Sequence, residues 1–78
     1  MSHTPHELAD EFPEHVAKMQ RLKADSAHFA KLFNDYHDIN RAVHRAETNV
    51  EPMEDRAEID LRKKRAILKD EIYRYLTN

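Results

Sequence analysis

Apolar residues recur at alternating steps of three and four along residues 29–50, and this spacing constrains the fold more than any other feature of the chain. The residues of this stripe are Phe29, Leu32, Tyr36, Ile39, Val43, Ala46 and Val50. A stripe with this period lies along one side of an α-helix and is typical of helices that pack on each other in coiled coils. The stripe therefore predicts a long helix over residues 26–48 that buries one face against another helix.

A second apolar stripe, within residues 55–76, has matching spacing. Its members are Leu61, Leu68, Ile72 and Tyr75, and Arg65 occupies one inward position, with its guanidinium expected in water. Asn49 and Pro52 favour a loop over residues 48–54, and a short loop makes two helices antiparallel neighbours. The pairs that this fold brings together are Val43 with Leu61, Tyr36 with Leu68, Leu32 with Ile72, and Phe29 with Tyr75. The sequence thus predicts an all-α antiparallel helical hairpin with a coiled-coil-like seam.

Residues 4–24 are expected to form an N-terminal helical segment that is broken twice. The run Thr4-Pro5-His6-Glu7 has the spacing of a capping box, with Pro5 suited to the first helical position, so a short helix or turn is expected over residues 4–12. Pro13 lacks a backbone donor and predicts the first break. Asp25, with Ser26 after it, predicts the second break, because both residue types cap helices. A chain of 78 residues without glycine suits one helical domain spanning residues 1–78.

The predicted hairpin carries more apolar residues than one seam can bury. Those beside the seam are Phe33, Ile59, Ile67, Tyr73 and Leu76. One way to cover them uses the apolar residues of the N-terminal segment, which are Leu8, Phe12, Val16, Met19 and Leu22. The other way is a second hairpin, which would give a four-helix dimer. The sequence leaves both open, and with them the oligomeric state.

Three stretches of the two long helices resemble a known family. They are His28-Phe29-Ala30-Lys31-Leu32-Phe33, the run from Ile39 to Glu47, and Leu61-Arg62-Lys63-Lys64-Arg65 with Leu68-Lys69-Asp70-Glu71-Ile72. Together these stretches resemble the YdcH-like family of small bacterial proteins, a domain family of unknown function. The resemblance implies a small, helical, coiled-coil-like protein of the bacterial cytoplasm, and it implies no activity, substrate or cofactor.

A basic run in the second long helix is the candidate partner-binding site. It consists of Arg62, Lys63, Lys64 and Arg65. Such a run can bind nucleic acid or an acidic protein, or it can be a solvated face that pairs with Glu58 and Asp60. The net charge of −2 and the absence of a nucleic-acid-recognition signature make nucleic acid the less favoured partner.

Other chemistry finds little support in the residue pattern. The chain has six histidines, but His37 and His44 lie two helical turns apart, and no pair of Glu-x-x-His motifs occurs. There is no cysteine for a thiolate site, and a thin hairpin offers no water-excluding pocket for catalysis. We therefore expect no metal, cofactor or small-molecule substrate, and a protein that is not an enzyme. The absence of a signal sequence and of a long apolar run predicts a cytoplasmic protein without membrane contact.

The main functional prediction is a non-enzymatic module for protein–protein interaction or self-association. It would present a helical face to an unidentified protein partner or to a second copy of itself. The alternative is a nucleic-acid-associated accessory protein that uses Arg62 to Arg65.

Overall fold

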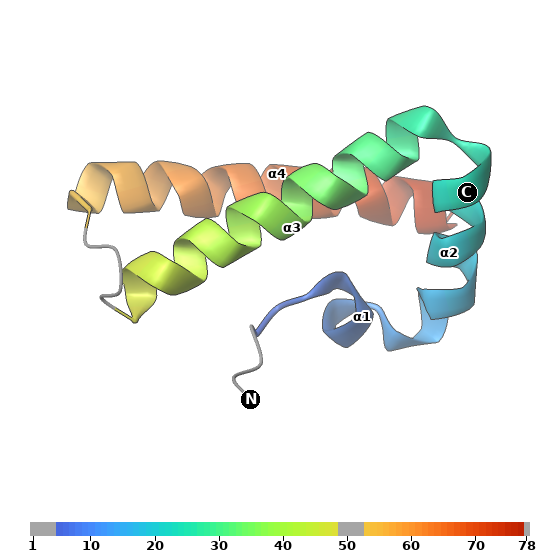
Figure 1. Ribbon diagram of the computed structural model, residues 1–78, viewed down its shortest axis with the longest axis horizontal. Helices are drawn as coiled ribbons and strands as arrows, with labels where there is room; N and C mark the ends of the chain where they lie inside the picture. Colours follow the sequence, from blue (N-terminus) through green and yellow to red (C-terminus); the bar gives the residue numbers. More distant parts are fainter. Residues whose placement is uncertain (1–4, 49–52, 78) are drawn as a thin grey trace.

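The chain folds into helices alone over the part that a computed structural model describes, residues 5–48 and 53–77. The helices are α1 (Leu8–Glu11), α2 (Val16–Asp25), α3 (Ala27–Glu47) and α4 (Asp55–Thr77), with a 3-10 turn, η1 (Pro13–His15), between α1 and α2. Figure 1 shows α3 and α4 running in opposite directions and crossing, with α2 standing across the end where α3 begins and α1 lying below the two long helices. The predicted all-α antiparallel hairpin is confirmed.

Both predicted breaks in the N-terminal segment are present. α1 ends at Glu11, and Pro13 begins the 3-10 turn that leads into α2. Ser26 is extended, with φ −129°, and its hydroxyl accepts a hydrogen bond of 3.1 Å from the backbone N–H of Phe29. This contact satisfies one of the free N–H groups at the start of α3, so Ser26 separates α2 from α3 as its residue type predicts.

The start of the N-terminal segment differs from the prediction. α1 begins at Leu8 rather than at Pro5, and Glu7 stands at its N-cap without a side-chain hydrogen bond. The reason is the backbone of His6, whose φ of 64° is left-handed and cannot continue into an α-helix. Thr4, the predicted capping residue, lies outside the described residues, as do Asn49, Val50, Glu51 and Pro52 of the predicted loop.

The hydrophobic core forms where the N-terminal segment meets the two long helices. Its buried residues are Leu8, Met19, Phe29, Leu32, Tyr36, Ile72 and Leu76, and Phe12, Leu22, Phe33, Leu68 and Tyr75 pack against them. Burying one such side chain contributes about 1.5–3 kcal/mol, which lets the short N-terminal helices persist. One face of the hairpin is therefore covered by the chain's own N-terminal segment.

The predicted register of the hairpin is confirmed at its open end. The rings of Phe29 and Tyr75 meet edge to face with their centroids 5.4 Å apart. Leu32 and Ile72 lie in the same core cluster. Nearer the connection, Val43 is fully buried, as the stripe predicts.

The seam departs from the prediction at its centre. The fully buried residue is Asn40, with none of its surface exposed, whereas Ile39 is only half-buried. Asn40 follows Tyr36 by four residues and precedes Val43 by three, so it satisfies the same helical spacing as Ile39. The placement of Ile39 at the centre of the seam is wrong, because a polar residue with hydrogen-bond partners takes that position.

Candidate interaction surface

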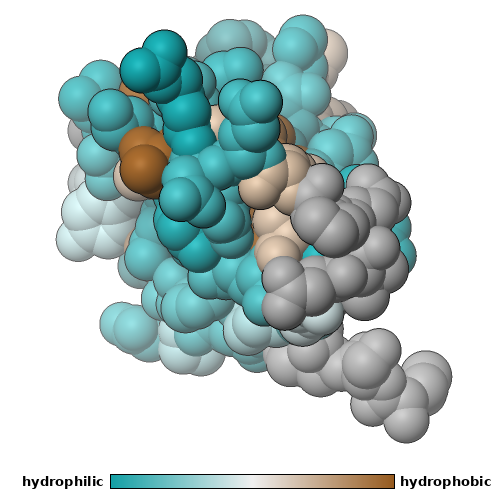
Figure 2. Space-filling view, turned by 90° about the vertical axis from the view of Figure 1, so that its left-hand side faces the viewer, coloured by the Kyte–Doolittle hydropathy of each residue, from teal (hydrophilic) through white to brown (hydrophobic). Residues whose placement is uncertain are grey.

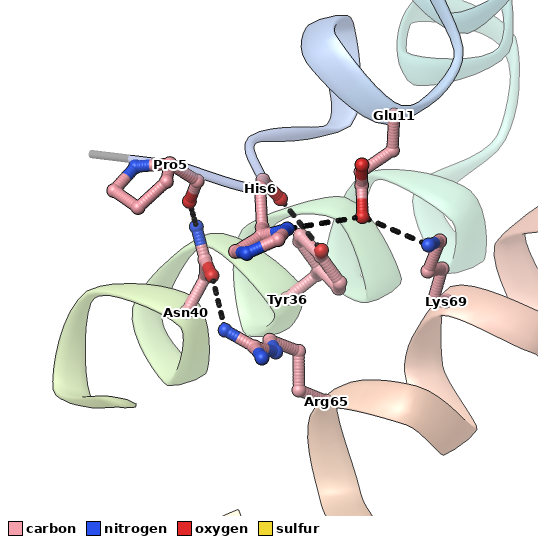
Figure 3. Close-up of polar contacts among 7 residues, drawn as sticks. All are labelled: Pro5, His6, Glu11, Tyr36, Asn40, Arg65 and Lys69. Atoms are coloured by element: carbon pink, nitrogen blue, oxygen red, sulfur yellow. Dashed lines mark hydrogen bonds and ion pairs between the residues drawn. The ribbon is translucent and has the colours of Figure 1, made fainter. Parts of the chain in front are cut away.

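At the centre of the molecule, Asn40 of α3 links the N-terminal segment to α4. Its Nδ2 donates a hydrogen bond of 2.8 Å to the carbonyl of Pro5, and its Oδ1 accepts one of 3.0 Å from Nη1 of Arg65 (Figure 3). A buried amide is tolerated when its donors and acceptors find partners. The guanidinium of Arg65 is therefore held against α3 by a hydrogen bond, and not simply left in water as expected.

Tyr36 makes a parallel contact one turn earlier on α3. Its hydroxyl donates a hydrogen bond of 2.6 Å to the carbonyl of His6 (Figure 3). Burial raises the pKa of Tyr36 to about 12, and the negative charge of Glu11 acts in the same direction. The left-handed backbone at His6 turns the carbonyls of Pro5 and His6 toward α3, where these two side chains bind them.

Charged contacts hold the N-terminal segment at its edges. Lys69 Nζ of α4 lies 2.8 Å from Oε1 of Glu11, and the hydrogen bond from this ammonium lowers the pKa of Glu11. Nδ1 of His37 lies 3.0 Å from Oε2 of Glu7. The segment is thus tied to both α3 and α4, and it closes one face of the hairpin.

The predicted basic site does not form one continuous patch, since helical periodicity turns its four residues in different directions. Arg62 contacts two carboxylates, Glu47 at 3.1 Å and Glu58 at 3.0 Å. Arg65 points toward Asn40, as described above. Lys63 and Lys64 are exposed, and Lys64 lines a groove.

That groove lies between α3 and α4 and has a volume of about 330 Å³. Its lining residues are Asp35, Asp38, Ile39, Lys64, Ile67 and Leu68. Tyr36, His37 and Asn40 of α3 hold the N-terminal segment, and their positions on the helix face a different side from the groove. The groove therefore lies on a part of the hairpin that the N-terminal segment leaves open.

Ile67 is the most exposed apolar side chain of the groove. It keeps 59% of its surface exposed, while Ile39 and Leu68 beside it are half-buried. Tyr73, which the sequence also placed beside the seam, stacks on Phe12 of the N-terminal segment at 5.6 Å. The N-terminal segment thus contacts part of the predicted excess apolar surface, and Ile67 is left in the groove.

The end of the hairpin has a different character. Figure 2 looks at the end where α3 stops and α4 begins, and it shows hydrophobic residues as separate spots within a hydrophilic surface. Ile59, which lies in α4 outside the groove, is 47% exposed. Isolated apolar residues of this kind are ordinary on protein surfaces.

Within residues 5–48 and 53–77, no three His, Cys, Asp or Glu side chains gather in a way that could hold a metal ion. The same part of the chain has no helix whose length and apolar character would let it cross a bilayer.

Comparison with known families identifies the family to which the hairpin belongs. The family described as "Protein of unknown function (DUF465)" matches residues 29–76. The chain belongs to this family. YdcH-like proteins are members of DUF465, so the predicted resemblance is confirmed. The match begins at Phe29 in α3 and ends at Leu76 in α4, and it thus includes every residue that lines the groove. Comparisons with curated proteins and with solved structures gave no match.

Proposed function

We propose that this DUF465 protein is a non-enzymatic interaction module that buries its α3–α4 groove against a helix of another polypeptide chain. The observation behind the proposal is Ile67, which is 59% exposed within a groove that Ile39 and Leu68 also line. Full burial of an exposed isoleucine contributes about 1.5–3 kcal/mol, and because Ile67 is 59% exposed, burying the rest of it contributes about 1–2 kcal/mol to association. An amphipathic helix fits such a groove with apolar residues spaced three and four apart.

The rims of the groove supply charges that can orient a partner. Asp38 of α3 and Lys64 of α4 are exposed, and neither forms an ion pair with another of the described residues. Charges at the edge of an apolar contact contribute more to orientation and specificity than to affinity. A partner helix therefore meets an apolar floor between an acidic rim and a basic rim.

The fold supports this use of the groove, since the other face of the hairpin is already occupied. Leu8 and Met19 of the N-terminal segment are buried against it, and Asn40 and Tyr36 bind the backbone of that segment. Nucleic-acid binding through Arg62 to Arg65 has less support, because Arg62 and Arg65 already contact protein acceptors.

Two matched substitutions test the proposal. Ile67→Glu places a carboxylate in the groove, and Ile59→Glu makes the same change on the same helix outside it. Both sites are exposed, so both variants should fold. The measurement is the native mass of the epitope-tagged chain in an extract of its source cell, obtained by size-exclusion chromatography with immunodetection.

We expect the wild-type chain and Ile59→Glu to elute well above the monomer mass of 9.3 kDa, and Ile67→Glu to elute as a monomer. A wild-type chain that elutes as a monomer, or two variants that behave alike, would contradict the proposal.

A further inference from the structure

We infer that the chain which fills the groove is a second copy of this protein. This inference rests on the proposed function and names the partner. Its basis is the distribution of charge, because Asp35 and Asp38 of α3 line one side of the groove and Lys64 of α4 lines the other. A surface whose two halves carry opposite charges is complementary to itself after a suitable two-fold rotation.

The charges select one orientation of the two copies. A two-fold axis that runs along the groove places α3 of each copy against α4 of the other, at the same height along the helices. Asp35 and Asp38 then face Lys64 of the second copy, and this pairing occurs twice in the dimer. Each α3 has antiparallel α4 neighbours on both sides, which is the arrangement of a four-helix bundle.

The other orientation along the same faces is unfavourable. An axis across the groove would place α3 against α3 and α4 against α4. Asp38 would then face Asp38, and Lys64 would face Lys64. Like charges opposed across an interface suppress association, so the charge pattern argues against this dimer.

Charges farther along the helices agree with the first orientation. Lys31 precedes Asp35 by one turn and lies 2.8 Å from it, and Glu71 follows Lys64 by two turns on the same side of α4. The contact of Phe29 with Tyr75 places Lys31 and Glu71 near the same end of the hairpin. The axis along the groove therefore brings Lys31 near Glu71 of the second copy, again with opposite signs.

The apolar residues complete the contact. Ile67 of each copy meets the groove of the other, where Ile39 and Leu68 are half-buried in one chain alone. The N-terminal segment does not obstruct this docking, because it is bound through Tyr36, His37 and Asn40 on another side of α3.

The experiment measures mass by sedimentation equilibrium on the full chain over a range of concentrations. The variants are Lys64→Glu and Asp38→Lys, each at an exposed position, and circular dichroism checks that each remains helical. Each substitution alone places like charges together twice in the dimer. We expect each to raise the dimer dissociation constant about tenfold or more relative to wild type.

Mixing the two variants makes the test specific. In the mixed dimer, the glutamate introduced at position 64 of one chain faces the lysine introduced at position 38 of the other, while the remaining pair keeps its native Asp38 and Lys64. We therefore expect the mixture to dimerise about as tightly as wild type, although each variant alone is weakened. A mixture no tighter than its components would overturn this docking.

A second outcome separates this inference from the proposed function. If purified wild-type protein stays monomeric at every concentration, the homodimer is wrong. Should the tagged chain nevertheless elute above its monomer mass in the native extract, with Ile67→Glu releasing it, the groove binds a different protein and the proposed function stands.

Discussion

Replacing Asn40 by alanine should destabilise the fold more than the small size of the asparagine side chain suggests. Asn40 is fully buried and takes part in two hydrogen bonds, one to the carbonyl of Pro5 and one from Arg65. The alanine variant leaves the carbonyl of Pro5 and Nη1 of Arg65 without their partner on α3. It also removes the side-chain hydrogen bond that ties Pro5 to α3.

The expected cost follows from these two bonds. A neutral hydrogen bond contributes about 0.5–1.5 kcal/mol, and a bond to a charged group about 1.5–3 kcal/mol. Pro5 is exposed and Arg65 is half-buried, so water recovers part of the loss. We expect the free energy of unfolding to fall by about 2–3 kcal/mol. For a domain of this size, that corresponds to a melting temperature lower by roughly 10–20 °C.

Urea and thermal unfolding, followed by the helical circular dichroism signal, measure this change. All variants are measured at one protein concentration, low enough for the chain to be monomeric, because Ile39 lines the groove and a weaker dimer would lower the apparent stability. The matched control is Ile39→Ala at the neighbouring position. Ile39 is only half-buried, so we expect its truncation to cost about 1 kcal/mol.

The order of the two variants decides whether the reasoning is right. If Ile39 were the inward residue at the centre of the seam, its truncation would cost about 2–5 kcal/mol and exceed the effect of Asn40→Ala. That order, or an Asn40→Ala variant as stable as wild type, would refute the account of the buried network.

Two further predictions concern pH. The pKa of Tyr36 is raised to about 12 in the folded protein. The stability that the neutral Tyr36 hydroxyl adds to the fold is therefore complete below the pKa of a free tyrosine and is lost as pH rises toward 12. Between about pH 9.5 and 12, the free energy of unfolding of wild type should fall by about 2–3 kcal/mol more than that of Tyr36→Phe. Equal losses in urea titrations would contradict this. The hydrogen bond from Lys69 lowers the pKa of Glu11 in the folded protein. The stability that the ionised Glu11 adds is therefore present above the pKa of a free glutamate and is lost as pH falls through the lowered pKa. The stability gap between wild type and Lys69→Met should therefore narrow from about pH 6 to about pH 3, and a constant gap would argue against the ion pair.

The hairpin could be predicted because its signal is local and repeated. The apolar spacing from Phe29 onward, matched by the spacing from Leu61 to Tyr75, fixes both the helices and their register. The breaks at Pro13 and Asp25 follow from residue type, since a missing donor and a capping side chain act within a few residues.

The centre of the molecule could not be predicted from apolar periodicity alone. Asn40 is buried because distant backbone and side-chain groups satisfy it, and the apolar stripe counts only Ile39 beside it. One signal was available, because Arg65 occupies an inward position of the second stripe at about the height of Asn40. Two polar residues facing each other across a seam indicate a hydrogen-bonded pair.

The groove also could not be predicted from the sequence. The sequence placed Ile67 beside the seam, yet it could not show which side the N-terminal segment covers. That choice depends on the left-handed backbone of His6 and on the two carbonyls that α3 binds. The basic run was chosen for its charge, but in the fold only Lys64 of that run lines the groove.

The most direct test of the groove as the interaction surface is photo-crosslinking from position 67 in living cells. A photoreactive amino acid replaces Ile67, and the same replacement at Ile59, exposed on the same helix outside the groove, is the control. Denaturing gels with immunodetection give the mass of each adduct. The account predicts a strong adduct from position 67, at twice the 9.3 kDa mass of the chain, and little or none from position 59. Equal adducts from both positions, or none from position 67, would contradict it.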